Sequence, residues 1–430
     1  MKVLYQSEVY ITALLLLFPL KISAQSYMDY YNQGLGYYEN QEYSMFIEYL
    51  SKADSLRPNH PTILYNLAVG YSRINDFKNT AIILNRRFQF NANNEFLIDE
   101  DFENFRVSKY FAEIESVYKK KSEKISTSEL AFTINEKGFH LEGIAYDSST
   151  ERFLFTDIHN GTIVSYNSSG KDMKLISDLS AQGFWGAFGI NLDPLDQNSL
   201  WVTTANIPEF KRFEENEDGK SALLKINRSS GEVQEVYSTN GNSKHLFGEL
   251  TIAEDGTIYV SDTISPNIFK LDLNQKKFSL FFTANWLWNL QGLDISKDGK
   301  YIYISDYILG IYKLHIETKK IAPLLSSLNS ITRGTDGLYL SANELILLQN
   351  GTNPRKIASI PIDTDRIISA GQVKVLDQNR ADISEPTMGV FVGNYFYFIG
   401  NSPWGFYTKK SKPDTLNWPI INILKLPIKN

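Results

Sequence analysis

Six short phrases of the sequence, each at the expected start of a strand, place oxygen-bearing side chains at matching positions. The phrases begin at Glu142, Phe188, Gly248, Gln291, Asp336 and Glu385. Glu142, Asp336 and Glu385 carry carboxylates, and Gln291 carries an amide oxygen. Hard divalent cations such as Ca²⁺ take about six to eight oxygen ligands, and clustered carboxylates repel one another unless a cation or protons neutralise them. If the phrases meet in space, these four residues are candidate ligands of a divalent metal, with Ca²⁺ favoured.

The spacing of the phrases indicates how they meet. They lie 46, 60, 43, 45 and 49 residues apart, and a period of roughly 40–50 residues with four strands per unit is typical of a β-propeller. The segments 249–273 and 292–316 show the plan of one unit: an inner strand, an Asp-Gly hairpin turn, a strand that ends at Ser-Asp, and a third strand. Inner strands follow the axial channel of a propeller, so the leading residues should converge at one mouth.

Residues 129–430 are therefore expected to form a six-bladed β-propeller. In a closed ring the last blade often borrows a strand from the beginning of the domain, which leaves no exposed sheet edge. We expect residues 130–134 to complete the blade built by 395–399 and 420–426.

Residues 27–120 have a helical period instead. Two copies of a 34-residue unit superpose, with Gly34 on Ala68, Tyr37 on Tyr71 and Leu50 on Leu84. This resembles the tetratricopeptide repeat (TPR), in which small residues let paired helices approach closely. A third helical stretch, 102–118, is expected to cap the pair, and 121–128 is typical of a solvated linker. The predicted fold class is multidomain α + β, a short TPR-like α-helical repeat array followed by a six-bladed β-propeller.

The role of the helical array stays open between a peptide-binding groove and a packing spacer. Repeat arrays usually need about three units to bury their faces. Two units and a cap should therefore lean on the second domain or on a protein partner.

Composition narrows the class of protein. The chain has 430 residues, a net charge of −6 and no cysteine, so no basic face favours nucleic acid and disulfides are excluded. Residues 1–24 are expected to be a signal peptide, with Lys2, an apolar run at 11–20 and cleavage near Ala24. That run is about half the ~20 residues of a membrane-spanning helix, so no membrane span is expected. Export without cysteines favours a periplasmic or secreted bacterial protein.

Four segments of the propeller region resemble a known family. They are LEGIAYD at 141–147, QGLDISKDGK at 291–300, TDGLYL at 335–340 and SEPTMGVFVGNYFYFIGNSPW at 384–404. Together they are similar to the SMP-30, gluconolactonase and LRE (regucalcin-like) group of six-bladed propellers, over roughly residues 130–426. The resemblance implies an axial divalent metal held by a Glu, two Asn and an Asp, a lactone or sugar-derived substrate, and an acid/base role for the Asp.

This resemblance assigns roles to individual residues. Glu142 matches the family Glu, Asp336 matches the family Asp, and Gln291 falls where one Asn is expected. The other Asn position meets Phe188 or Gly248, which have no side-chain oxygen. Either Glu385 replaces the missing ligand, or the metal is lost and the fold is kept as a binding platform.

In the enzyme interpretation, the metal polarises the carbonyl and lowers the pKa of a bound water, and Asp336 or Glu385 transfers the proton. The expected reaction is metal-dependent hydrolysis of a lactone or ester. Gly-x-Ser-x-Gly elbows and Cys/His zinc arrays are missing from the sequence. The alternative is a non-catalytic protein- or carbohydrate-binding module that uses the TPR-like array and the propeller top.

Four further residues are candidates for substrate binding. His140 and His245 precede inner strands, and Trp185 and Trp288 lie close to inner-strand positions. A histidine there could act as a base, and the indoles could wall a pocket for a ring-shaped ligand. The alternative for each of them is ordinary packing.

Overall fold

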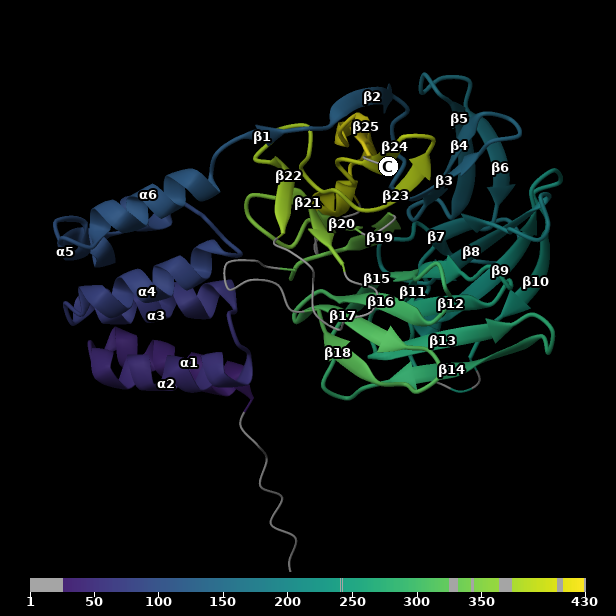
Figure 1. The fold of residues 1–430 in the computed structure, drawn as a ribbon. Helices are drawn as coiled ribbons and strands as arrows, with labels where there is room; N and C mark the ends of the chain where they lie inside the picture. The colour runs from purple at the N-terminus through teal and green to yellow at the C-terminus, as the bar shows by residue number, and fades with distance from the viewer. Residues whose placement is uncertain are drawn as a thin grey trace, which may run out of the picture.

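The computed structural model describes residues 26–428 except for 240, 242, 325–331, 342–343, 363–372 and 408–412. The expected signal peptide at 1–24 lies outside the described residues. Figure 1 shows an N-terminal stack of helices beside a ring of sheets. Among the described helices, none is both long and apolar enough to cross a membrane.

The helical array consists of helix pairs in the expected positions. Its longer helices are α1 (Tyr27–Glu39), α2 (Tyr43–Leu56), α3 (Pro61–Arg73), α4 (Phe77–Phe88) and α6 (Phe111–Lys121). Helix α3 begins 34 residues after α1, and α4 begins 34 residues after α2. The helix expected at 102–118 is divided into the short α5 (Glu103–Arg106) and the beginning of α6. Two 3-10 turns, Glu95–Leu97 and Glu100–Phe102, precede α5.

Local signals explain where these helices begin and why they pack closely. Ser26 and Asp29 form a reciprocal capping box at the start of α1, and Pro61 occupies the first turn of α3, where its missing N–H costs nothing. A Cβ atom on Gly70 would lie 2.7 Å from a carbon of Ile47. Glycine at this position therefore lets α2 and α3 pack closely.

The propeller has six sheets of antiparallel strands. Blade 1 contains β3 (Leu141–Asp147), β4 (Arg152–Asp157), β5 (Thr162–Asn167) and β6 (Lys174–Asp178). Blade 2 contains β7 (Gly186–Leu192), β8 (Ser199–Ala205), β9 (Ser221–Asn227) and β10 (Val233–Tyr237). Blade 3 contains β11 (Phe247–Ile252), β12 (Ile258–Asp262), β13 (Asn267–Asp272) and β14 (Lys277–Thr283).

The second half of the ring repeats this order. Blade 4 contains β15 (Leu290–Ile295), β16 (Tyr301–Asp306), β17 (Gly310–His315) and β18 (Ile321–Pro323). Blade 5 contains β19 (Gly337–Ser341), β20 (Glu344–Gln349), β21 (Lys356–Pro361), β22 (Lys374–Gln378) and the short β1 (Ile125–Ser126). Blade 6 contains β23 (Gly389–Val392), β24 (Tyr395–Ile399), β25 (Ile421–Pro427) and β2 (Glu129–Ile134).

Blade 6 closes the ring in the predicted way. Strand β2 pairs with β25, and β25 pairs with β24. The expected completion of the last blade by residues 130–134 is therefore confirmed. Buried aliphatic side chains from adjacent blades then fill the spaces between sheets, as Leu154 of blade 1 and Val202 of blade 2 do in one cluster.

The inner strands come into backbone contact around the axis. In blades 1 to 4 the pairing register shifts at the leading residue, for example between Leu141 and Ile144, as in a β-bulge. The glycine that follows the leading residue fits against the next blade: a Cβ on Gly143 would lie 2.2 Å from the carbonyl oxygen of Phe188. A Cβ on Gly337 would lie 2.4 Å from the carbonyl oxygen of Thr387. The leading positions of blades 1 to 5 thus form a tight ring, which Thr387 completes in blade 6.

The repeated Ser-Asp phrase has a structural role. Asp306 accepts backbone hydrogen bonds from Trp288, just before β15, and from Ile308, just after β16. It thereby links the loop that precedes β15 to the turn that follows β16. The preceding Ser305 donates across to the carbonyl oxygen of Thr335 at 2.5 Å. These residues hold the blade tops together.

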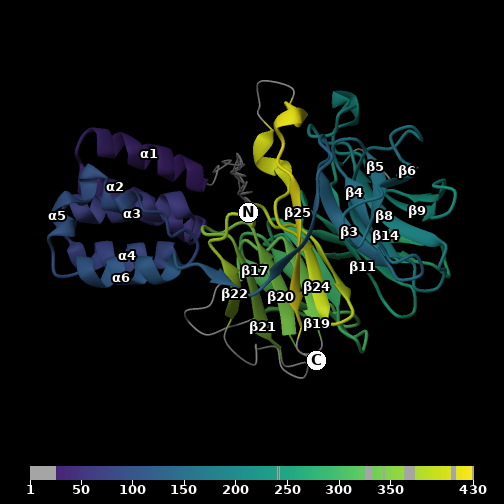
Figure 2. The ribbon, with the colours of Figure 1, turned by 90° about the horizontal axis from the view of Figure 1, so that it is seen from above.

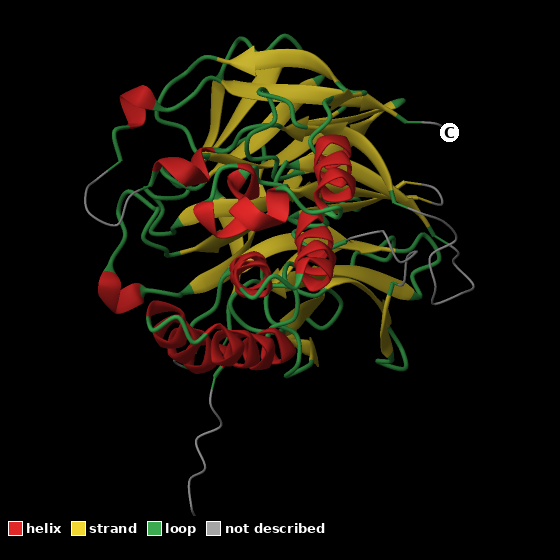
Figure 3. Ribbon diagram, turned by 90° about the vertical axis from the view of Figure 1, so that its left-hand side faces the viewer, coloured by secondary structure: helices red, strands yellow, loops and turns green. Residues whose placement is uncertain are grey.

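The helical array packs against the propeller, as Figures 2 and 3 show from two further directions. Asn91 and Asn353 form a parallel bridge, in which the Ala92 N–H lies 2.7 Å from the Asn353 carbonyl oxygen and the Asn353 N–H lies 2.7 Å from that of Phe90. Arg333 also donates to the carbonyl oxygen of Pro58. The expectation that the array leans on the second domain agrees with these contacts.

The segment expected as a solvated linker, 121–128, is partly structured. Residues Ile125–Ser126 form β1, which pairs with β22 of blade 5. The backbone N–H groups of Thr127 and Ser128 donate to the carboxylate of Asp377. The charge-rich sequence predicts a solvated linker, but part of the segment joins the sheet of blade 5 by pairing with β22.

Candidate active site at the axial mouth

Glu142 stands at the start of the first inner strand and is almost completely buried. Its side chain accepts hydrogen bonds on Oε2 from the Ser402 hydroxyl and the Trp404 indole N–H, both at 3.0 Å. Burial raises the pKa of Glu142 well above its ordinary value, the Asp336 carboxylate raises it further, and the two donors oppose this rise. Glu142 therefore keeps its proton more readily than an exposed glutamate does.

Asp336 lies across the mouth, directly before β19. The Asn350 amide donates to Asp336 Oδ2 at 2.7 Å, and the Tyr307 hydroxyl donates to the Asn350 carbonyl oxygen at 2.9 Å. Burial raises the pKa of Asp336 to about 7, with the Asn350 hydrogen bond lowering it and the charge of Glu385 raising it. This carboxyl group titrates near neutral pH, which suits a group that transfers protons.

Glu385 is part of an ion pair. Both Nε and Nη2 of Arg355 donate to Glu385 Oε2, at 3.0 and 2.6 Å. Burial raises the pKa of Glu385, while the charge and hydrogen bonds of Arg355 lower it. The guanidinium thus supplies positive charge at the position where the sequence predicts a metal ion.

Glu385 does not occupy the sixth ring position. The carbonyl oxygen that meets Gly337 belongs to Thr387, and the Thr387 hydroxyl lies 3.4 Å from the Glu142 carbonyl oxygen. The ring position is therefore two residues after Glu385. The Glu-Pro of this phrase resembles the Glu-Gly of blade 1, which is why the sequence alone places the ring position two residues too early.

The remaining leading residues divide the mouth into a polar side and an apolar side. Gln291 donates from its amide to Asn289 at 2.8 Å. Phe188 is buried in a cluster with Ile158 and Ala205, and Gly248 contributes no side chain. The polar groups thus come from blades 1, 4, 5 and 6.

The structure brings the three predicted acids together but does not arrange them as metal ligands. Asp336 and Glu385 both raise the pKa of Glu142 by their charge, so the three groups share one electrostatic environment. Within the described ranges, no group of three or more His, Asp or Glu side chains could hold a metal ion. With Glu385 bound to Arg355 and Glu142 bound to two donors, the four expected ligands do not fit a divalent ion in this arrangement.

His140 connects the mouth to a neighbouring cavity. It is fully buried, its Nδ1 lies 2.9 Å from the Tyr407 hydroxyl oxygen, and its Nε2 lies 3.8 Å from Glu142 Oε2. Burial, with His159 nearby, lowers the pKa of His140 well below its ordinary value, so the ring is neutral. At 3.8 Å these two atoms are too far apart for a hydrogen bond, so the neutral imidazole borders Glu142 and the Ser402 and Trp404 donors orient it.

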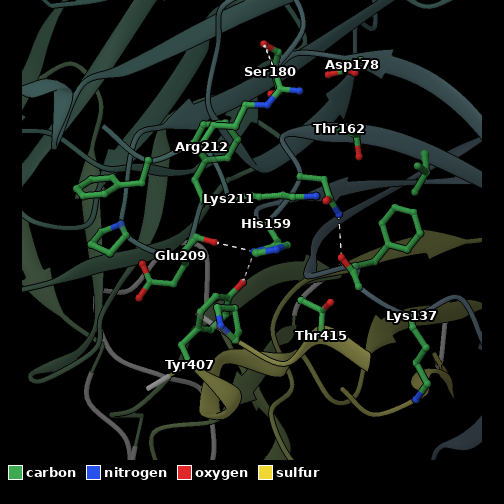
Figure 4. Close-up of a pocket in the computed structure, with 18 of the residues that line it drawn as sticks. Lys137, His159, Thr162, Asp178, Ser180, Glu209, Lys211, Arg212, Tyr407 and Thr415 are labelled. Atoms are coloured by element: carbon green, nitrogen blue, oxygen red, sulfur yellow. Dashed lines mark hydrogen bonds between the residues drawn. The ribbon is translucent and has the colours of Figure 1, made fainter. Parts of the chain in front are cut away.

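The cavity has a volume of about 1370 Å³ and lies beside blades 1 and 2 (Figure 4). Three cationic side chains line it: Lys137, Lys211 and Arg212. His159 Nδ1 lies 3.0 Å from the Glu209 carbonyl oxygen and 3.5 Å from the Tyr407 hydroxyl (Figure 4). Trp404 lines the cavity while its indole holds Glu142. The cavity and the mouth therefore share a wall.

Sequence reasoning missed this cavity, although a signal was present. The second unit is the longest of the six, because a charged insert at 211–220 interrupts it. Lys211 and Arg212 at the start of that insert face the cavity. An insert rich in charge at a blade top is a sign of a binding loop.

The other predicted substrate-binding residues lie apart from this cavity. His245 Nδ1 lies 2.6 Å from Asp262 Oδ2, and the Trp185 indole donates to Glu217 at 3.1 Å. Trp288 is 45% exposed and contacts Arg57 of the helical array, with the guanidinium 5.6 Å from the ring centre. Only His140 of the four lies against a predicted acid.

Comparisons with known proteins give similar solved structures but no family. No protein-family model and no curated protein matches the chain. The chain is similar to the PQQ-bound aldose sugar dehydrogenase of Streptomyces coelicolor, with 10% identity and a TM-score of 0.49 over 70% of this chain and 98% of that chain. It is similar to a gluconolactonase of Xanthomonas campestris, with 13% identity and a TM-score of 0.48 over 71% of this chain and 91% of that chain. A luciferin-regenerating enzyme shares 15% identity, with a TM-score of 0.46 over 68% and 92%. At such identities and TM-scores the likeness assigns no activity to this chain.

Proposed function

We propose that this protein is an exported SMP-30/gluconolactonase-like hydrolase, which opens a small lactone or sugar-derived ester at the axial mouth. One observation carries the proposal: Glu142 and Asp336 share the mouth, and their surroundings give them different affinities for a proton. Paired carboxyl groups with separated pKa values are a common acid/base arrangement. The polar network of Tyr307 and Asn350 holds Asp336 in place.

The two carboxyl groups have different roles, Asp336 as the general base and Glu142 as a hydrogen-bond donor. Ionised Asp336 takes a proton from a water molecule as the water oxygen bonds to the carbonyl carbon of the substrate. Protonated Glu142 donates a hydrogen bond to the carbonyl oxygen, where negative charge develops. When the ester C–O bond breaks, the leaving alkoxide takes the proton from Asp336. The products are a carboxylic acid and an alcohol, and both enzyme groups return to their initial states.

The neighbouring cavity favours an anionic, ring-shaped substrate. Its three cations outnumber the two acids of its lining, Asp178 and Glu209, and so attract a carboxylate or phosphate group. Trp404 and Tyr407 offer aromatic faces. Arg355 is 40% exposed at its side chain and lies at the mouth beside Glu385, where a substrate oxyanion could compete for its N–H groups. A sugar acid fits this combination of charge and ring contacts.

An axial Ca²⁺ would require the four expected ligands to leave the arrangement described above, which does not fit a divalent ion. A cation would relieve the repulsion among the acids as a proton does. It would need oxygens of Glu142, Asp336 and Gln291, and it would compete with Arg355 for Glu385. Because the arrangement found here satisfies the acids with protons and Arg355, we assign no step of the reaction to a metal.

The test is a panel of lactones and sugar-acid esters assayed with the full chain, with and without added Ca²⁺. Asp336→Asn should lower kcat/KM by about 100-fold or more, as loss of a general base does. Asp255→Asn is the matched control, because Asp255 lies in an exposed turn between β11 and β12 and its loss should change nothing. Absence of hydrolysis across the panel, in both conditions, would favour the non-catalytic binding module.

A further inference from the structure

A second cavity lies on the propeller axis, beyond the ring of leading residues. Its volume is about 290 Å³, and its lining comes from inner strands β3, β7, β11, β15, β19 and β23, which surround the axis in Figure 1. The lining residues follow the leading residues along these strands, so the cavity sits further from the mouth. We call it the lower chamber.

Glu249 supplies the chamber with a buried carboxyl group at an unusual position. It occupies the place after the leading residue, where blades 1, 2, 4 and 5 have glycine. The residue is 8% exposed, and its Oε1 accepts a hydrogen bond from the Tyr339 hydroxyl at 3.1 Å. Its Oε2 has no hydrogen-bond partner within the described part of the chain. A buried oxygen without a donor is unfavourable unless a ligand or water satisfies it.

Tyr339 cannot satisfy both oxygens, because its hydroxyl is fixed on the other side. The backbone N–H of Gly389 donates to that hydroxyl at 3.0 Å. The single hydroxyl proton is then directed to Glu249 Oε1. The second oxygen remains available to a donor that enters the chamber.

Asp294 adds a fixed negative charge. Its Oδ2 accepts from the Leu340 N–H at 2.7 Å, and its Oδ1 accepts from the Thr251 hydroxyl at 3.1 Å and the Ile295 N–H at 2.8 Å. Burial raises the pKa of Asp294 to about 6, and these three donors limit the rise, so the group is ionised at neutral pH. Burial raises the pKa of Glu249 well above its ordinary value, and the charges of Asp336 and Asp294 raise it further against the Tyr339 hydrogen bond. A cation that enters the chamber therefore takes the place of the Glu249 proton, which is released to solvent.

The chamber has no positive side chain to balance this charge. Its described lining contains no Lys, Arg or His, and aliphatic side chains such as Leu250, Leu293 and Met388 form the rest of the wall. The volume is close to the lower end of ligand pockets, about 300 Å³. A negatively charged, partly apolar pocket of this size suits a small cation that carries both N–H donors and a short alkyl group.

We propose that the lower chamber binds a small organic ammonium ion, whose N–H group donates to Glu249 Oε2 near Asp294 while its alkyl group packs against Leu250, Leu293 and Met388. This site is separate from the proposed hydrolytic function and does not depend on it. The bare oxygen of Glu249 fixes where the ammonium group sits.

The experiment measures binding of n-propylammonium chloride to the full chain by calorimetry and by thermal unfolding, with KCl at equal ionic strength as the reference. We expect saturable binding with one site per chain and a Tm increase of about 2 °C or more at about 10 mM probe. Glu249→Gln should abolish both signals. Glu254→Gln, in the exposed turn that follows β11, should retain them.

Three outcomes would overturn the proposal: no saturable binding to the wild-type chain, equal binding to Glu249→Gln, or a response to Ca²⁺ in place of the ammonium probe. Because Glu249→Gln removes a buried acid and could alter folding, Leu293→Phe provides a second variant that fills the chamber and leaves Glu249 in place. It should weaken binding by about tenfold or more. If Glu249→Gln still hydrolyses a lactone but no longer binds the ammonium probe, the chamber and the hydrolytic site are independent.

Discussion

The indole nitrogen of Trp404 lies 3.0 Å from Oε2 of Glu142, so a residue of the last blade holds the acid of the first. The same Trp404 lines the cavity beside blades 1 and 2. Ring closure and the candidate active site therefore depend on a shared contact. The strand pairing of β2 with β25 closes the ring at its outer edge, and this hydrogen bond helps to close it near the axis.

Trp404→Phe should destabilise the protein by about 1–3 kcal/mol, because it removes a donor from a buried carboxyl group while keeping an aromatic ring in place. Unfolding in urea measures the change. Trp286→Phe is the control, since Trp286 is 48% exposed and its replacement should shift stability by no more than about 0.5 kcal/mol. Equal stability of the two variants would mean that the hydrogen bond contributes nothing.

The stability of the protein should fall as pH rises from about 4 to about 7. Asp336 has its folded pKa raised from 3.8 to about 7, so in this window the native state keeps a proton that the unfolded chain has lost. Asp336→Asn should make the decline shallower, by about 1–3 kcal/mol across the window after allowance for partial exposure. Urea unfolding at several pH values measures it, and Asp255→Asn should keep the wild-type slope.

Activity, if present, should rise with pH through an apparent pKa near 7, because Asp336 acts as a base only when ionised. Arg355→Met should move this apparent pKa upward, since it removes a positive charge from the mouth and leaves Glu385 unpaired. The pH dependence of kcat/KM reports the shift. Lys297→Met, in an exposed turn at the far end of blade 4, should leave the profile in place, and an unchanged profile in Arg355→Met would contradict the assignment of Asp336.

Gly143→Ala should be costly, because its methyl group would lie 2.2 Å from the Phe188 carbonyl oxygen and 2.6 Å from Thr156 Oγ1. Overpacking of this kind destabilises by about 1–3 kcal/mol, and by more where backbone must move. The midpoint of thermal unfolding measures the loss. Gly405→Ala should be neutral, since a Cβ there meets nothing within 4 Å, and a neutral Gly143→Ala would mean that the inner strands can spread.

The sequence predicts the blades well because each blade is built from strands that are consecutive in the sequence. Hairpin turns, alternation and the 40–50-residue period all lie within neighbouring residues, and the borrowed strand at 130–134 follows from closure of the ring. The convergence of Glu142 and Asp336 follows from the same symmetry. Each leading position repeats the one before it, so their meeting needs no knowledge of side-chain contacts.

The partners of these acids could not be predicted, because loops of variable length bring them. Arg355 approaches Glu385 across 30 residues of sequence, and Trp404 approaches Glu142 across 262. No period relates these pairs. Thr387 was missed for a different reason: the Glu-Pro phrase at 385 resembles the earlier phrases, but the carbonyl oxygen that meets Gly337 of blade 5 belongs to Thr387, two residues later.

The loop between β20 and β21 joins two parts of the molecule that the chain presents as separate. Asn350 at one end holds Asp336, Arg355 at the other end holds Glu385, and Asn353 between them is hydrogen-bonded to the backbone of the helical array. Six consecutive residues therefore act as a mechanical linkage. Whatever displaces the helices must either break the Asn353 bridge or drag the groups that position both acids.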